Sequence, residues 1–196
     1  MSLNKEKFVY WIQERESIRQ LKEMDLPKPW SIDPVFQTTY FCNVDREHDK
    51  VTKWIRERWE GSGSSQHKYI QLALPNMIMA RMVNKPSSLF SMGWPWVTFS
   101  DETWTKVMSQ PGAWGSAYIV STNGRAMPKH DYIAGLLEQA FERFSGGPGT
   151  QAPPTLSGWH KAIQGLPGMG SFMAAQVVAD LKNTKNHPLA DAEDWH

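Results

Sequence analysis

The sequence has little cysteine, little net charge and no long apolar run. Its one cysteine, Cys42, excludes an internal disulfide and a zinc site built from clustered cysteines, and it favours a reducing compartment. The apolar runs are shorter than the roughly 18 residues that indicate a membrane-spanning helix, and the N-terminus lacks a signal-like apolar core. We therefore expect a soluble, cytoplasmic protein with no membrane partner.

The charges nearly cancel, with 21 Lys and Arg against 20 Asp and Glu, so the composition neither indicates nor excludes nucleic acid as a partner. Hydrophobic residues make up 40% of the 196 positions, which is too many for a disordered chain. At roughly 100 to 200 residues per domain, the length predicts one domain that spans residues 1–196.

Aromatic residues are abundant, with 10 Trp, 8 Phe and 5 Tyr. Such rings either fill a helical core or offer platforms for flat ligands such as nucleobases. Trp30 and Trp94 stand beside prolines in expected turns, so they are the candidates for base stacking. The cluster Trp94-Pro95-Trp96 also fits a plug in the core, which is the more frequent role of an aromatic-proline cluster before a helix, and the pattern leaves both interpretations open.

Apolar residues recur at helical spacing along most of the chain and predict a mainly α fold. The predicted helices cover residues 4–24, 34–40, 45–60, 69–83, 100–108, 131–144, 155–164 and 171–181. Pro75 must kink its helix or start a new one. Residues 117–121 are the only short run with an extended pattern.

The last two predicted helices flank a short turn, Gly165-Leu166-Pro167-Gly168-Met169-Gly170. Two glycines one residue apart at the start of a helix leave backbone amides uncovered, and a helix start attracts phosphate. This predicts a DNA-binding hairpin over 155–182 with these contact residues: Gly168, Met169, Gly170 and Ser171. The alternative is that the glycines only form a turn.

The stretch from Leu166 to Leu181 closely resembles the helix-hairpin-helix element of DNA glycosylases. The resemblance implies a glycosylase-like helical fold in which the turn holds a DNA phosphate. Phe172 stands where lyase-type glycosylases carry a Schiff-base lysine, which argues against a bifunctional enzyme. Glycosylases place an essential aspartate about ten residues after the second helix, and Asp194, then Asp191, are the matching candidates here.

A second group of polar residues follows Phe41 and Cys42. On a helix, Asn43, Arg46 and Asp49 are three apart and share one face. Together they would offer an amide that can read a base edge, a guanidinium for phosphate and a carboxylate that accepts a proton. A solvated, salt-bridged helix face would show the same pattern.

Three segments together resemble one phage-associated family: residues 29–34, residues 41–49, and residues 168–174 with Asp180. This family, the α-glutamyl/putrescinyl thymine pyrophosphorylases, includes the helical domain of 5-hydroxymethyluracil DNA kinases and the amino acid:DNA transferases of thymidine hypermodification. The resemblance implies a bacteriophage enzyme of the host cytoplasm. It implies that an amine, either an amino acid such as glycine or glutamate or a polyamine, replaces phosphate or pyrophosphate on the 5-methylene of modified uracil in double-stranded DNA. Functional coupling to a DNA kinase follows from the same resemblance.

Such an enzyme would flip the modified nucleotide into a pocket with apolar or aromatic walls. Arg46 is the first candidate for holding the leaving phosphate, followed by Arg125 and Lys129, and Asp49 or Asp194 would accept the proton of the amine. The residues present require no metal and no cofactor.

Two alternatives remain open at this stage. One is a non-catalytic module that binds modified DNA or assists a separate kinase, since the chain has no P-loop sequence of its own. The other is a monofunctional DNA glycosylase that uses Asp194 or Asp191.

Overall fold

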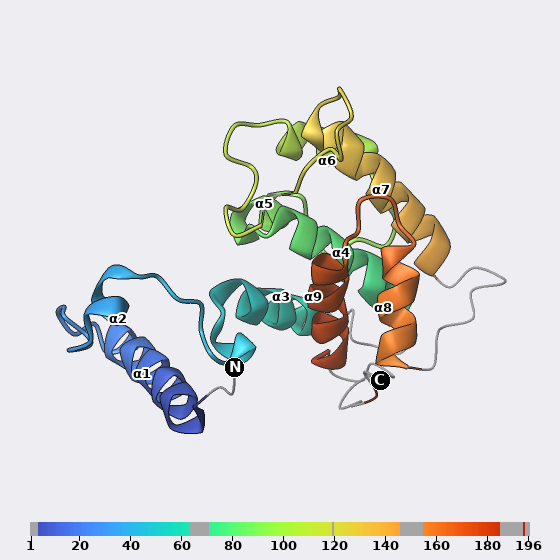
Figure 1. The fold of residues 1–196 in the computed structure, drawn as a ribbon. Helices are drawn as coiled ribbons and strands as arrows, with labels where there is room; N and C mark the ends of the chain where they lie inside the picture. Colours follow the sequence, from blue (N-terminus) through green and yellow to red (C-terminus); the bar gives the residue numbers. More distant parts are fainter. Residues whose placement is uncertain (1–3, 63–70, 119, 146–154, 185–193, 195–196) are drawn as a thin grey trace. The chain divides into compact units, whose positions relative to one another are not determined.

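The computed structural model describes residues 4–62, 71–118, 120–145, 155–184 and 194, and every regular element within them is helical (Figure 1). The prediction of a mainly α fold is therefore confirmed. In chain order the elements are α1 (Lys5–Glu23), α2 (Pro34–Thr38), the 3₁₀ helix η1 (Arg46–His48), α3 (Lys50–Gly61), α4 (Ala73–Val83), α5 (Pro86–Ser91), α6 (Asp101–Met108), α7 (Lys129–Phe144), α8 (Leu156–Gln164) and α9 (Ser171–Lys182).

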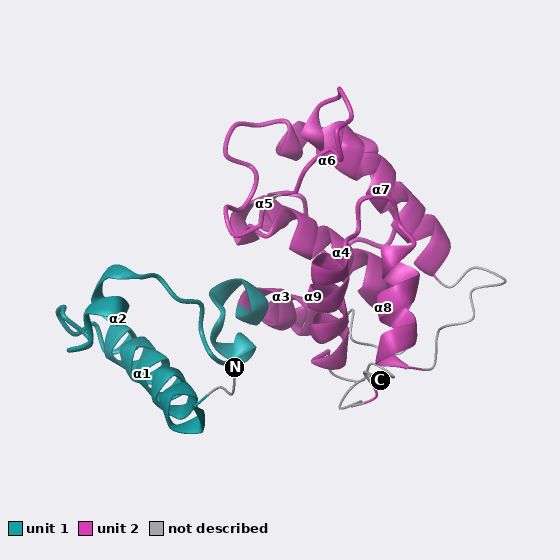
Figure 2. Ribbon diagram, in the orientation of Figure 1, with its two compact units in different colours: residues 1–53 teal, residues 54–196 magenta. Residues whose placement is uncertain are grey.

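The chain divides into two compact units, Met1–Lys53 and Trp54–His196 (Figure 2). Unit 1 holds α1, α2, η1 and the start of α3, and unit 2 holds the rest of α3 and the helices from α4 to α9. The single domain expected from the chain length stays a prediction.

Polar side chains cap the starts of several helices. The side chain of Asp33 accepts a hydrogen bond from the amide of Val35 at the start of α2, and that of Thr155 accepts one from Gly158 at the start of α8. Pro75 lies in the first turn of α4, where its missing amide would have no partner within the helix anyway. Of the two alternatives for Pro75, a kink or a new helix start, the structure shows the helix start.

The predicted helix over 45–60 is wrong at its start. The Asp45 carboxylate accepts the amide of Glu47 and begins η1, and the Asp49 carboxylate accepts the amide of Thr52, 2.7 Å away, and begins α3. Asp competes for nearby amides in this way and so favours caps over helix interiors. Two capping aspartates four residues apart therefore divide the predicted helix into two elements.

Two further differences concern short segments of unit 2. None of the described residues between 117 and 121 belongs to a strand, and no described segment offers a strand with which they could pair. Helix α5 was not predicted, although Pro86 stands at its first position, because six residues are too few for a helical period to be visible.

The core of unit 2 surrounds α4, whose residues from Ala73 to Val83 are all buried. Helix α4 packs against both α7 and α9, and α8 and α9 lie side by side (Figure 1). Such a helix buries polar groups only when they are paired, and its Arg81 meets Asp180 of α9 in an ion pair. No helix among the described residues is both long and apolar enough to cross a membrane.

Candidate functional site: a helical hairpin and a capped polar turn

The turn between α8 and α9 presents glycines outward and apolar side chains inward. The side chains of Leu166 and Met169 are buried, whereas Gly168, Gly170 and Ser171 are exposed. The amide of Met169 donates to the carbonyl of Leu166 within the turn. Of the predicted DNA-contacting residues, Met169 therefore anchors the turn instead of facing outward, because both its side chain and its amide are used inside it.

Gly168 is required by its surroundings. Its φ is +85°, which favours glycine, and a Cβ built there would lie 2.5 Å from the hydroxyl oxygen of Tyr132 in α7. Tyr132 is buried, and no described residue hydrogen-bonds its hydroxyl group. The Cα of Gly168 thus rests on the Tyr132 ring, which fixes where the exposed side of the turn lies.

The start of α9 has no side-chain cap. Gly170 is the N-cap residue, and a Cβ there would meet nothing within 4 Å. The Ser171 hydroxyl lies 3.3 Å from Nε2 of His160 in α8. A helix start with no side chain over it presents amide donors and the positive end of the helix dipole to an incoming anion.

Arg125 and Lys129, the second-choice phosphate ligands, have different surroundings. The guanidinium of Arg125 lies 5.5 Å from the centre of the Tyr132 ring, so it is near the residue on which the hairpin turn rests. The ammonium of Lys129 lies 4.0 Å from the centre of the Trp114 ring, and burial lowers its pKa below the ordinary 10.5. Arg125 is therefore the better placed of the two for a phosphate held at the turn.

A pair of aromatic rings at the start of α9, the exposed Phe172 and the half-buried Tyr118, was not foreseen from the sequence. Phe172, in the first turn of α9, is 60% exposed, and its ring lies edge-on to Tyr118 at 5.6 Å between centres. The Tyr118 hydroxyl donates to the side chain of Gln176. The sequence pattern marked Phe172 only as the replacement of a lysine, and no periodicity relates it to Tyr118.

Asn43, Arg46 and Asp49 lie in one short polar turn of unit 1 and not on one helix face as predicted. The Asn43 amide nitrogen donates to the carbonyl of His48 at 2.9 Å, Arg46 opens η1, and Asp49 ends η1 and caps α3. The imidazole of His48 lies 3.9 Å from the Glu16 carboxylate of α1. The three predicted residues therefore form a capped polar turn, defined here as residues 43–49.

Asp194 belongs to unit 2, where its carboxylate accepts a hydrogen bond from the amide of Leu156 at 3.1 Å. That amide is one of the donors at the start of α8 that have no partner within the helix, so Asp194 contacts the first helix of the hairpin. Asp191, the other aspartate candidate, lies outside the described residues.

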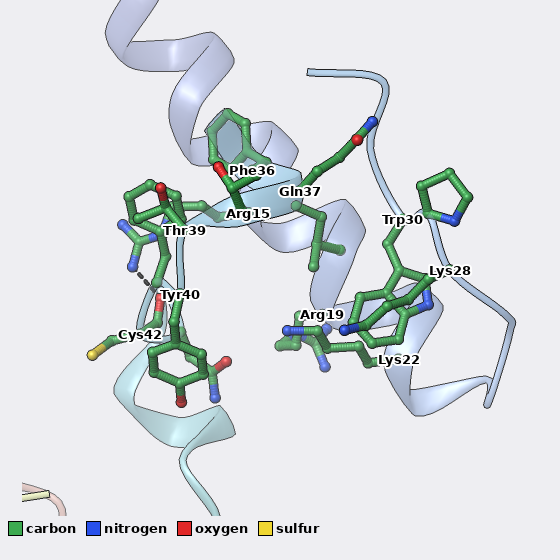
Figure 3. Close-up of a pocket in the computed structure, with 15 residues that line it drawn as sticks. Arg15, Arg19, Lys22, Lys28, Trp30, Phe36, Gln37, Thr39, Tyr40 and Cys42 are labelled. Atoms are coloured by element: carbon green, nitrogen blue, oxygen red, sulfur yellow. Dashed lines mark hydrogen bonds between the residues drawn. The ribbon is translucent and has the colours of Figure 1, made fainter. Parts of the chain in front are cut away.

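The two tryptophans proposed for stacking, Trp30 and Trp94, differ in their exposure. Trp94 is 0% exposed, donates its indole N–H to the carbonyl of Asn76 and packs against the rings of Trp54 and Trp59. The prediction that Trp94 is a stacking platform is therefore wrong, because neighbouring side chains cover its ring. Trp30 is partly exposed and lines a pocket of unit 1 (Figure 3).

The described part of the chain contains no group of three or more His, Cys, Asp and Glu side chains arranged to hold a metal ion.

Comparison with known proteins gives a relative and a family. A protein named 5-hmdU DNA kinase, from Bacillus phage SP10, is 23% identical over 189 residues, which cover 86% of this chain and 29% of the relative. The chain thus spans less than a third of the relative's length. No solved structure matches the chain significantly. Residues 4–196 match the family described as "5-hmdU DNA kinase, helical domain", which confirms this part of the expected resemblance. The chain therefore belongs to the family of 5-hmdU DNA kinase helical domains.

Proposed function

We propose that this chain binds double-stranded DNA containing a phosphorylated 5-hydroxymethyluracil base and transfers an amine to that base. The observation that carries the DNA-binding part is the uncapped start of α9, with Gly170 facing open space behind a turn that rests on Tyr132. A DNA phosphate fits such a helix start because the amides and the helix dipole both favour an anion. Arg125, beside Tyr132, would hold an adjacent phosphate.

The modified base is suggested by the relatives. The family is described by a kinase that acts on 5-hmdU DNA, and the phage relative has the same name. A kinase of that kind produces a phosphate ester on the base's methylene group. That ester is a leaving group, and an enzyme that uses it would act on the same DNA.

The transfer step needs an amine as its second substrate and no other reactant. The amine nitrogen attacks the exocyclic methylene carbon, a carbon–nitrogen bond forms, and the carbon–oxygen bond to phosphate breaks, so phosphate leaves with the electron pair. The ammonium proton goes to a carboxylate. In the capped polar turn of unit 1, Arg46 would hold the leaving phosphate, Asn43 would bind the base edge and Asp49 would accept the proton.

Mass spectrometry of nucleosides tests this proposal. Duplex DNA carrying the phosphorylated base is incubated with the protein and a mixture of glycine, glutamate and putrescine, and the expected result is a nucleoside that has lost phosphate and gained an amine. Arg46→Ala should abolish the product, and Lys50→Ala, which removes an exposed charge at the start of α3, should not. Full transfer by a folded Arg46→Ala protein would contradict the assignment of Arg46.

A second function is favoured by the comparisons: a non-catalytic DNA-binding module that assists a kinase. The matched family is a domain of a kinase, and the chain spans only 29% of the relative. The same experiment separates the possibilities. Unchanged nucleosides together with tight duplex binding support the accessory module, whereas loss of the base identifies a glycosylase.

A further inference from the structure

A pocket of about 620 Å³ lies within unit 1, between α1 and the chain that leads through α2 to Asn43 (Figure 3). Its volume is in the range of small-ligand sites, roughly 300 to 1,000 Å³. Four basic side chains and four aromatic rings line it, and none of the described lining residues is acidic. The capped polar turn contributes only Asn43 to this lining.

The positive charge gathers on one side of the pocket, where Figure 3 shows Arg19, Lys22 and Lys28 around Trp30. Arg19 is neutralised by hydrogen-bonded ion pairs with carboxylates of α1. The ammonium groups of Lys22 and Lys28 each lie 4.9 Å from the centre of the Trp30 ring, which places the two charges within about 10 Å of each other. Neither lysine forms an ion pair with a described carboxylate.

Two unneutralised ammonium groups this close repel each other, because their separation is comparable to the Debye length of about 8 Å at physiological ionic strength. An anionic phosphate group between Lys22 and Lys28 would replace this repulsion with two charge-assisted hydrogen bonds. The charge arrangement therefore favours a phosphorylated ligand over a neutral one.

The aromatic side chains add a planar surface next to the lysines. The Trp30 indole is held by its N–H, which donates to the carbonyl of Leu26 at 2.7 Å. Tyr40 lines the same pocket and is 85% exposed, and Lys22 lies 6.0 Å from the centre of its ring. An exposed ring beside a cation pair is the arrangement that stacks a nucleobase while the cations hold its phosphate.

We infer that this pocket of unit 1 binds a nucleotide, with its phosphate between Lys22 and Lys28 and its base against Tyr40. Stacking tolerates every base, so the pocket distinguishes phosphorylated from unphosphorylated ligands more strongly than one base from another. The nucleotide is either free or part of a DNA strand. The inference stands without the proposed amine transfer, because it concerns binding alone.

Isothermal titration of the full chain tests the inference, with thymidine monophosphate, thymidine, inorganic phosphate and a short single-stranded oligothymidylate as ligands. The monophosphate should bind on the order of tenfold or more tightly than thymidine or phosphate. Tighter binding of the oligonucleotide identifies a nucleotide within a strand, and tighter binding of the monophosphate identifies a free nucleotide.

Variants assign the binding to the pocket. Lys22→Ala/Lys28→Ala and Tyr40→Ala each change exposed side chains, so they should keep the fold, which circular dichroism checks, and weaken monophosphate binding on the order of tenfold. Lys5→Ala/Lys7→Ala removes the same charge from the opposite end of α1 and should bind normally. A Gly170→Thr change in the hairpin should also leave monophosphate binding intact, so failure of DNA binding at the hairpin is distinguishable from failure of the pocket.

Three results would overturn the inference. The first is no monophosphate binding at millimolar concentration. The second is equal binding of thymidine and its monophosphate. The third is an equal loss in the Lys22/Lys28 and Lys5/Lys7 variants, which would show that only net charge matters.

Discussion

Arg81 and Asp180 form a bidentate ion pair between α4 and α9, with Nε 2.5 Å from Oδ2 and Nη2 2.6 Å from Oδ1. Their side chains are 1% and 4% exposed. The pair attaches the second helix of the hairpin to the buried helix of unit 2, and so it fixes the helix whose N-terminus is proposed to hold DNA phosphate.

Removing one partner of this pair should destabilise the protein strongly. Asp180→Ala leaves the Arg81 charge buried without its carboxylate, which costs about 3–5 kcal/mol of the free energy of unfolding. Urea unfolding followed by circular dichroism measures this loss. The double variant Arg81→Met/Asp180→Leu should recover much of it, since apolar side chains of similar size need no charge partner. An Asp180→Ala protein as stable as the original would contradict this role of the pair.

The two glycines of the hairpin should respond differently to substitution. Gly168→Ala should lower the free energy of unfolding by about 1–2 kcal/mol, because alanine is strained at the positive φ of this position. The loss should be larger still, because the new Cβ would clash with the Tyr132 hydroxyl. Adding Tyr132→Phe removes that oxygen and should restore part of the loss. Thermal unfolding measures both effects, and an unaffected Gly168→Ala variant would mean that the turn tolerates a side chain.

Gly170→Thr should preserve stability and weaken DNA binding. Threonine is an accepted N-cap residue, and the space at Gly170 is open, so the fold should tolerate the change. The new side chain would cover the amides at the start of α9 and exclude a phosphate. Duplex affinity at fixed salt should fall on the order of tenfold. If the affinity is unchanged, the hairpin is only a turn.

Asp49 caps α3, and a suitable substitution separates this structural role from its proposed role as the proton acceptor. Asp49→Ala removes the cap of α3 and should cost about 1 kcal/mol, whereas Asp49→Ser keeps a capping oxygen and should cost little. If Asp49 is the proton acceptor of the transfer, both variants lose activity. Transfer that persists in Asp49→Ser would identify another group as the base.

Acid should destabilise α1. Hydrogen bonds from Arg19 hold the pKa values of Glu16 and Glu23 below their ordinary 4.5. Because the folded pKa values lie below the unfolded ones, the stabilisation is complete above pH 4.5 and is lost as the pH falls through the folded values. The effect is small, since Glu23 is exposed and Glu16 is partly exposed, so water screens both ion pairs. Circular dichroism from pH 7 to pH 2 should show a loss of helix below pH 4.5 that is smaller in Arg19→Gln. Identical pH profiles for the original protein and Arg19→Gln would contradict this role of the Arg19 ion pairs.

Much of the helical fold was predictable because its signals are local. The apolar spacing within α7, the Asp33-Pro34 start of α2 and the Thr155 cap of α8 involve residues within a few positions of one another. The helix over 45–60 failed for a local reason too, since Asp45 and Asp49 can cap a helix as well as lie within one. Periodicity alone does not decide between these roles.

The site was predictable in part. The glycine pattern indicated the hairpin, and the same residues that suggested DNA contact lie at its exposed turn, apart from Met169. The sequence did not decide between core and platform for Trp94 and did not indicate the pairing of Phe172 with Tyr118, because both depend on neighbours distant in sequence.

The sequence by itself determined a helical chain with one cysteine, balanced charge and a Gly-x-Gly hairpin, because composition, caps and turn glycines act over a few residues. Only the tertiary structure decided which tryptophans are core, which glycine is sterically required, and that Arg81 meets Asp180 across 99 positions. It also brought Lys22, Lys28, Trp30 and Tyr40 around one pocket. These relationships depend on packing between segments far apart in the chain, and no local pattern encodes them.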